Sequence, residues 1–218
     1  MTDPSTDRVL LVNKPLEWTS FDVVRKLRNK LKIKKIGHAG TLDPLATGLL
    51  IICTGKMTKR IDEYQAQEKE YTGRFILGQT TPSHDLETEV TEPTDISHIT
   101  REQVIDNTKK FTGAIDQIPP MHSAIKIDGK RAYELARKGE TAELKSRQVI
   151  ISTFEITAIE LPSISFRVVC TKGTYIRSLA RDYGNALGVG AYLAELCRTR
   201  IGNFRLEDAI QIEDIGGA

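Results

Sequence analysis

The chain has 218 residues, and its 39% apolar and 28% charged residues are typical of a folded globular protein, which excludes an intrinsically disordered chain. No apolar run approaches the ~20 residues of a membrane span, and the first eight residues lack the features of a secretory signal. Three cysteines, none in a Cys-x-x-Cys pair, exclude a fully paired disulfide framework and predict a reducing, cytoplasmic setting.

The charge is unevenly distributed along the chain. The net charge of +2 excludes a uniformly basic nucleic-acid binder. However, residues 14–35 contain eight Lys or Arg against two acids, whereas residues 82–106 contain seven acids against one Arg. The sequence therefore predicts one local basic face, and we interpret the acidic segment as a solvated face rather than a regulatory element.

An amphipathic helix is predicted over about residues 20–32, after a short apolar strand at 9–12. Thr19 and Asp22 have the spacing of a capping box at its start. Its opposite face carries most of the basic side chains. The predicted apolar face recurs at helical spacing and comprises Phe21, Val24, Leu27 and Leu31.

The rest of the chain mixes short strands and helices without a regular βα alternation. Polar or glycine-rich loops are predicted at 37–48 and 79–97. Extended segments are predicted at 49–53, 71–77, 118–127, 149–161, 164–170 and 197–204. Helices are predicted at 56–65, 101–111, 130–138, 176–187 and 191–196. This pattern favours an α+β fold with a mostly antiparallel mixed sheet, as one domain over 9–210 between short tails at 1–8 and 211–218.

The glycine-rich loop presents the first candidate for chemistry. Its sequence, GHAGTLDPLATG, matches neither a phosphate-binding P-loop nor a dinucleotide fingerprint. What remains is a carboxylate, Asp43, directly before Pro44, and an Asp-Pro step is also a common turn former. The pattern alone favours a surface histidine for His38 in the same loop, and the four histidines of the chain have no metal-ligand spacing. No metal site is therefore expected.

A second candidate lies at a strand-to-helix junction. Tyr175 and Arg177 stand at the start of the predicted helix 176–187, where polar side chains are commonly presented to a cleft. The plainer interpretation is a packed tyrosine and a surface ion pair. No nucleophile motif of the Gly-x-Ser-x-Gly kind is present.

Six segments, collinear over residues 13–204, together resemble the bacterial tRNA pseudouridine synthase B family, whose members convert uridine 55 in the T-loop of tRNA to pseudouridine. They are NKPLEWTSFDVV (13–24), GHAGTLDPLATGLLIICTGKMTK (37–59), EYTGRFILGQTTPSHD (70–85), PPMHSAIKIDGKRAYELAR (119–137), CTKGTYIRSLARDYG (170–184) and YLAELCRTRIGNF (192–204). The resemblance implies a pseudouridine-synthase-like catalytic domain that uses no cofactor or metal and acts on the T stem-loop of tRNA. A monomer is the default expectation for its oligomeric state.

The resemblance also implies roles for individual residues. Asp43 matches the catalytic aspartate, and Arg177 the arginine that pairs with it. Tyr71 matches the tyrosine that stacks on the target base, Tyr175 an aromatic of the pocket, and His38 the histidine that engages the T-loop where the base is flipped out. Weaker matches around the cleft are Lys14, Lys59 and Leu196.

The sequence departs from the family pattern at three places. Glu17 stands where the KPxGxxS motif usually has glycine, and His122 stands where an aromatic usually follows the Pro-Pro pair. The chain ends about 14 residues after the last match, without the small RNA-binding PUA-type module that many members carry. Two alternatives stay open: an RNA-binding or tRNA-folding helper, and a related synthase that acts on another RNA.

Overall fold

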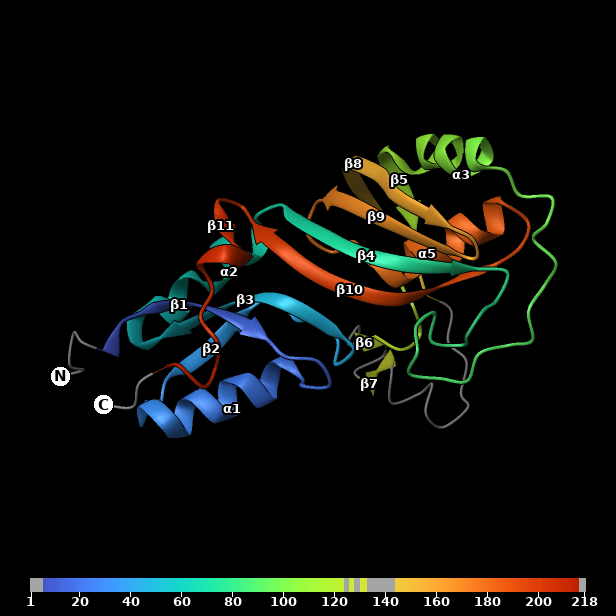
Figure 1. Cartoon of the computed structure of the whole chain (residues 1–218). Coiled ribbons are helices and arrows are strands. Elements are labelled where there is room, and N and C mark those ends of the chain that lie inside the picture. The colour runs from blue at the N-terminus through green and yellow to red at the C-terminus, as the bar shows by residue number, and fades with distance from the viewer. Residues whose placement is uncertain (1–5, 124–125, 128–129, 133–143, 216–218) are drawn as a thin grey trace. The chain divides into compact units, whose positions relative to one another are not determined.

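The computed structural model describes residues 6–123, 126–127, 130–132 and 144–215. These residues divide into two compact units (Figure 1). The first unit contains residues 1–72 and 195–218, and the second contains residues 73–194. Along the chain, strands β4 (Lys69–Leu77) and β10 (Ala191–Ile201) each run from one unit into the other. The prediction of a single domain over 9–210 stays a prediction.

The first unit is organised around β3 (Ala46–Thr54). Strand β1 (Val9–Lys14) runs antiparallel to β3 along its whole length, and β2 (Ile36–Ala39) pairs with the last four residues of β3, also antiparallel. The end of β10 lies parallel to the start of β3 and is extended by a hairpin with β11 (Phe204–Arg205). Strand β3 therefore begins beside β10 and ends between β1 and β2.

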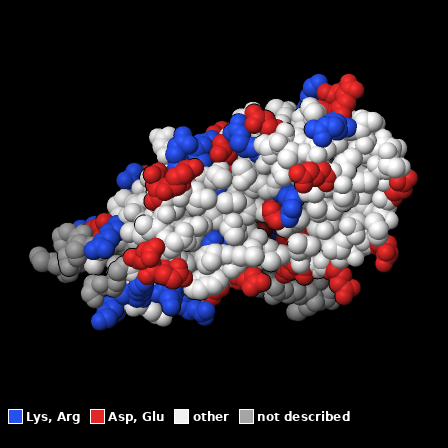
Figure 2. Space-filling view, viewed as in Figure 1, with Lys and Arg blue, Asp and Glu red and all other residues white. Residues whose placement is uncertain are grey.

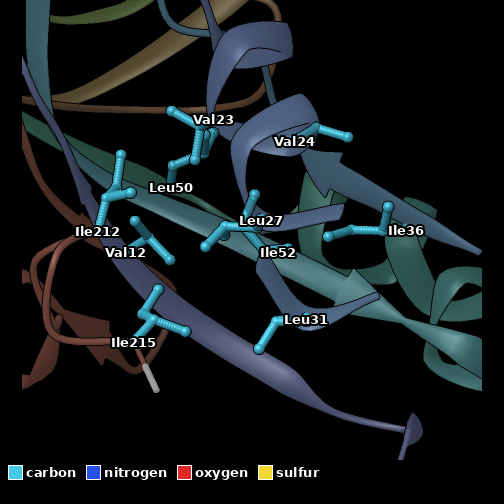
Figure 3. Close-up of a cluster of buried hydrophobic side chains, with 10 residues drawn as sticks. All are labelled: Val12, Val23, Val24, Leu27, Leu31, Ile36, Leu50, Ile52, Ile212 and Ile215. Carbon is cyan, nitrogen blue, oxygen red and sulfur yellow. The ribbon is translucent and has the colours of Figure 1, made fainter. Parts of the chain in front are cut away.

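Helix α1 (Ser20–Leu31) forms as predicted, because Thr19 and Asp22 make both hydrogen bonds of the capping box. Its buried side chains point onto β1 and β3, where Ile212 and Ile215 of the C-terminal segment join the same cluster (Figure 3). The predicted apolar face is wrong in one residue. Phe21 is 59% exposed, and Val23 is fully buried in its place. The i, i+3, i+4 spacing is compatible with burial of either Phe21 or Val23, and only packing against the strands determines which of the two is buried.

The far end of β3 leads into a short helical segment, predicted over 56–65. It begins as a 3-10 helix, η2 (Gly55–Arg60), and continues as α2 (Ile61–Ala66). Tyr64 of α2 packs edge-on against Phe204 of β11. These residues belong to a second buried cluster, which also includes Leu49, Ile51 and Cys53 of β3. Because β3 alternates between two covered faces, it is buried along nearly its whole length.

The second unit is built on the strand order β10-β4-β9-β8-β5. Strands β8 (Arg147–Glu160) and β9 (Ser163–Cys170) form the predicted antiparallel pair, and β5 (Gly113–Gln117) adds to β8. Helix α5 (Ile176–Ala186) contributes Tyr183 to an aromatic cluster with Phe75, Phe154 and Phe166. Helix α3 (Arg101–Asn107) and the 3-10 helix η3 (Thr108–Phe111) cover the predicted helix 101–111.

The α+β fold with its mostly antiparallel mixed sheet is confirmed, with corrections in single elements. Residues 191–196, predicted as a helix, are strand β10, because sheet pairing overrides the helix propensity of their Ala, Leu and Glu. Strand β2 takes the first three residues of the predicted loop 37–48 and β3 takes its last three, and β5 was not predicted. The predicted helix 130–138 begins with β7 (Lys130–Arg131), which pairs with β6 (Lys126–Ile127); residues 133–138 lie outside the described residues.

The unusual Glu17 is accommodated by a left-handed backbone. Its φ of 65° lies in the region that glycine adopts without penalty, which agrees with the glycine that the family pattern usually has at this position. A left-handed conformation costs an ordinary L-residue roughly 1–2 kcal/mol.

We therefore expect Glu17→Gly to raise the free energy of unfolding, measured by urea denaturation, by about 0.5–1 kcal/mol after the greater chain entropy of glycine is subtracted. The matched control is Glu92→Gly in an exposed loop, where φ is not left-handed and the same change should destabilise. A loss of stability in both variants would contradict the strain at Glu17.

Candidate active site

Asp43 lies in a six-residue loop, 40–45, between β2 and β3. The loop is shorter than the predicted 37–48, because its flanks are paired strands. The carbonyl of Asp43 accepts a hydrogen bond from the backbone N–H of Ala46 at 3.1 Å, which closes a turn at the start of β3. The glycine-rich sequence thus becomes a tight connection that presents a single carboxylate.

Arg198 of β10 supports this loop and was not predicted as a site residue. Its side chain is only 1% exposed. The guanidinium donates to the carbonyls of Leu49 at 2.8 Å, Gly40 at 3.0 Å and Thr41 at 3.5 Å. The approach depends on Gly48, which has a φ of 103° and where an added Cβ would come within 2.4 Å of the Arg198 carbonyl oxygen.

The turn between β1 and α1 holds the other end of the loop. The Ser20 hydroxyl donates to the carbonyl of Leu42 at 3.1 Å and accepts from the Leu42 N–H at 2.9 Å. The carbonyl of Pro44 accepts from the Glu17 N–H at 2.9 Å and from Lys14 Nζ at 3.2 Å. Asp43 therefore lies between two residues whose backbones are bonded to this turn.

Lys14 belongs to the interior and not to the basic face that the sequence predicted. It is fully buried, and besides Pro44 its Nζ donates to the carbonyls of Pro15 at 2.9 Å and Trp18 at 2.6 Å. Burial lowers the pKa of Lys14 to about 8, against the smaller raising effect of the Asp43 charge.

His38 stands on β2 and is half-buried. Burial lowers its pKa, and the positive charge of Arg198 adds to the effect against a smaller opposing contribution from the Gly40 backbone. Both effects favour the neutral imidazole. Its Nδ1 is buried and has no hydrogen-bond partner in the described part of the chain.

The other site residues predicted from the sequence in the first unit lie on three different elements. Tyr71 of β4 is 9% exposed. Leu196 of β10 pairs with Ala46, where β3 begins after the Asp43 loop. Lys59 lies exposed on η2. Leu196 thus borders the loop directly, and the substrate role of Lys59 stays a prediction.

In the second unit, Tyr175 caps the N-terminus of α5, as its position before the predicted helix suggested. The buried Gln117 side chain accepts from the Tyr175 N–H at 2.8 Å and donates to its carbonyl at 3.1 Å. The Arg147 guanidinium lies 4.6 Å from the centre of the Tyr175 ring. The tyrosine is therefore held through its backbone on one side and its ring on the other.

Arg177 is 4% exposed and is not a surface residue. Its Nε lies 3.5 Å from the carboxylate of Asp85, and its terminal nitrogens donate to the carbonyls of His122 at 2.8 Å and Ser83 at 3.4 Å. The interpretation of 82–106 as a solvated face is thus wrong for Asp85, which is buried. The predicted pairing of Arg177 with Asp43 would join the two units and stays a prediction.

Sequence reasoning missed Ser20, Asp85 and Arg198. Each lies inside a segment that carried the family resemblance, but spacing and periodicity alone do not distinguish a buried charge from an exposed one. Within the described residues, no three His, Cys, Asp or Glu side chains are arranged to hold a metal ion. No helix in the same ranges is long and apolar enough to cross a membrane.

The lowered pKa of Lys14 predicts a pH effect on folding. Between about pH 8 and 10.5, the ordinary lysine value, the unfolded chain binds more protons at this residue than the folded chain does, so stability rises with pH in that window. Relative to Lys14→Met, the free energy of unfolding of the unmodified chain should rise from pH 8 to 10.5 and stay level below pH 7. If the difference in unfolding free energy between the unmodified chain and Lys14→Met did not change with pH, the prediction would be contradicted. The matched control is Lys34→Met, at an exposed lysine, which should show no such rise.

Comparison with known proteins shows which family this chain belongs to. The sequence model of the TruB family pseudouridylate synthase (N terminal domain) matches residues 28–176, and that of the tRNA pseudouridylate synthase B C-terminal domain matches residues 177–218. The tRNA pseudouridine synthase B of Parabacteroides distasonis is 58% identical over 95% of this chain and 91% of its own length. The one of Flavobacterium johnsoniae is 56% identical over 94% and 93%.

Solved structures agree with this placement. The chain resembles a chain of a Cbf5-Nop10-Gar1 complex with a TM-score of 0.74 and 32% identity, covering 95% of this chain and 53% of that one. A chain of an H/ACA RNP bound to a substrate RNA containing 2′-deoxyuridine gives a TM-score of 0.72 and 28% identity, covering 99% and 58%. On these matches, the chain belongs to the TruB family of pseudouridine synthases.

Proposed function

We propose that this protein isomerises uridine to pseudouridine at position 55 in the T-loop of tRNA, with Asp43 as its catalytic carboxylate. The observation that carries the proposal is the family membership together with the held loop that presents Asp43. Curated relatives at 55–58% identity are tRNA pseudouridine synthases B. The matched chains of the Cbf5-Nop10-Gar1 complex and of the H/ACA RNP are less similar, at 28–32% identity. This difference favours tRNA over another RNA as the substrate.

The reaction requires few groups. The C1′–N1 bond breaks, the uracil turns, a C1′–C5 bond forms, the proton leaves C5, and N1 ends protonated. No atom is lost from the nucleotide, and no electron is transferred to an outside acceptor. A carboxylate near the sugar and the base is sufficient to begin the rearrangement, whether it attacks the sugar, attacks the base or removes a sugar proton to give a glycal.

The proposed reaction needs Asp43 in its ionised form. The negative charge of Asp43 acts on Lys14, where it opposes the lowering of the lysine pKa by burial. We assign Arg177 the role of favouring the ionised carboxylate of Asp43. Its own buried contacts with Asp85, Ser83 and His122 hold the guanidinium in one place before RNA binds.

The target base must leave the folded T-loop, at a cost of a few kcal/mol. We assign Tyr71 to stacking on the flipped uracil and His38 to the space that the base vacates. A neutral imidazole suits this role, because inserting it among bases does not strip water from a charge. Tyr175, Leu196 and Lys59 are assigned to the surrounding substrate contacts, whereas the buried Lys14 is assigned to the support of the Asp43 loop.

The exposed side chains of α1 and the residues after it supply a basic surface (Figure 2). Phosphates attract such a surface whatever the base sequence, which suits the stem of a tRNA. Two members of the basic segment do not belong to this surface, because Lys14 is buried and Lys30 donates to the carbonyls of Ile212 and Glu213. The exposed members are Arg25, Lys26, Lys32, Lys34 and Lys35.

The reaction is tested by incubating the protein with unmodified tRNA and mapping pseudouridine by carbodiimide treatment and primer extension. We expect one strong stop at the T-loop uridine. A substrate whose T-loop uridine is replaced by cytidine serves as the control and should give none. Absence of a stop with the unmodified tRNA would reject the proposal, and a stop elsewhere in tRNA or in another RNA would indicate a related synthase of different specificity.

The role of Asp43 is tested by Asp43→Asn, which keeps the shape of the side chain and removes its charge. We expect conversion to fall by about 10³-fold or more, because a group that acts on the reacting atoms has no substitute. Binding of tRNA, measured by filter retention, should stay within a few-fold of the unmodified protein. The matched control Asp116→Asn, on an exposed position of β5, should convert normally.

This variant also addresses the runner-up function, an RNA-binding or tRNA-folding helper. If tRNA refolding by the protein proceeds while neither the unmodified protein nor Asp43→Asn forms pseudouridine, the helper function is favoured. If Asp43→Asn retains conversion, the assignment of the carboxylate is wrong although the reaction stands.

A further inference from the structure

The backbone of the loop that carries Asp43 is bonded at every carbonyl from Gly40 to Pro44. Among these five oxygens, that of Asp43 accepts a hydrogen bond from a residue close by in the chain, through the N–H of Ala46 at the start of β3. The other four accept from groups outside the loop: Arg198, Ser20, Glu17 and Lys14. A surface loop ordinarily leaves such carbonyls to water. Here they are fixed by groups of β1, α1 and β10.

Ser20 is the nearest of these groups to Asp43 along the loop backbone. Its hydroxyl bonds to both the N–H and the C=O of Leu42, the residue directly before Asp43. Ser20 is 2% exposed and is the first residue of α1, so the capping box at Thr19 and Asp22 sets its position. A rigid helix start is therefore coupled to the peptide that precedes the carboxylate.

Arg198 of β10 holds the loop as well. The planar guanidinium fork of Arg198, formed by its three nitrogens, donates to the carbonyls of Gly40 and Thr41, before Asp43, and to that of Leu49, in β3. A buried guanidinium hydrogen-bonded to neutral carbonyls contributes little net stability, because the charge has lost its water. Its geometric effect is large, because the planar fork fixes several acceptors in one arrangement.

We propose that Ser20 and Arg198 are positioning residues for Asp43, which set where its carboxylate stands without touching the substrate. This inference rests on the proposed function of Asp43 in uridine isomerisation. A displacement of about 1 Å at a reacting group can cost about a hundredfold in rate. Loss of either residue should therefore slow the chemical step, whereas binding of tRNA, which uses the surface, should persist.

The test compares Ser20→Ala and Arg198→Lys with the unmodified protein in single-turnover conversion of tRNA, with protein in excess. Ser20→Ala removes both bonds to Leu42, and Arg198→Lys keeps the charge but removes the fork. We expect each to lower the saturating rate by about 10–100-fold and to leave the tRNA dissociation constant within about threefold. Backbone amide exchange in a peptide covering 40–48 should become faster in both variants.

The matched control is Thr54→Val, which also removes a buried hydroxyl from the first unit. Thr54 lies at the other end of β3, where its Oγ1 accepts from the Arg8 N–H at 2.9 Å. It should show a normal saturating rate even where its melting temperature falls as far as that of Ser20→Ala. A rate loss that follows only the melting temperature would assign Ser20 and Arg198 a merely structural role and overturn the inference.

Two results separate this inference from the proposed function. If the unmodified protein converts tRNA and Asp43→Asn does not, but Ser20→Ala and Arg198→Lys convert within twofold of normal, the positioning role is rejected and the function stands. If the unmodified protein forms no pseudouridine, the function fails. Amide exchange at 40–48 then still decides whether the two residues hold the loop.

Discussion

The parallel contact between β3 and β10 at Gly48 and Arg198 is the constraint on which the first unit depends. Gly48 has no side chain and a positive φ, so the β10 backbone can approach β3 to a distance that any Cβ would forbid. This approach brings the Arg198 side chain beneath the loop that carries Asp43. Burial lowers the pKa values of His38 and Lys14, and the positive charge of Arg198 adds to this effect. The geometry of the loop and part of its electrostatics thus depend on one glycine.

The two units hold their predicted residues by different means. In the first unit, the Asp43 loop is fixed through its backbone, by donors that satisfy its carbonyls. In the second, Arg177 is fixed through its side chain, by the carboxylate of Asp85 and two carbonyls. Both arrangements order polar groups in the protein alone. Because these groups are already ordered, RNA binding has a smaller entropic cost, which is the energetic advantage of preorganisation.

Much of the local structure could be predicted because the responsible signals are themselves local. The capping box of α1 and the long β8 and β9 pair are examples, since spacing and alternation within each segment determine them. The helix prediction for residues 191–196 was wrong for the opposite reason. Their Ala, Leu and Glu favour a helix, and only neighbours distant in the sequence turn them into a strand.

The same distinction applies to the candidate site. Asp43, His38, Tyr71 and Arg177 could be named from motifs, because family resemblance fixes residue identity. Burial could not be predicted from spacing: Lys14 lies in a basic run and Asp85 in an acidic run, yet both are inside. Arg198 carried no signal of its own, since its importance comes from three carbonyls that are far away in the sequence.

The way the Asp43 loop is held has a consequence for protein engineering. Residues 36–54 look like a compact, transferable module, with a strand on each side of the short loop that carries Asp43. Yet the groups that order the loop come from two other parts of the chain, the turn before α1 and the end of β10. Transplanted alone, the module would leave those carbonyls to solvent, and its carboxylate would sample many positions. A scaffold that is to inherit this chemistry must receive three segments, from 14–20, 36–54 and 196–198, in one register.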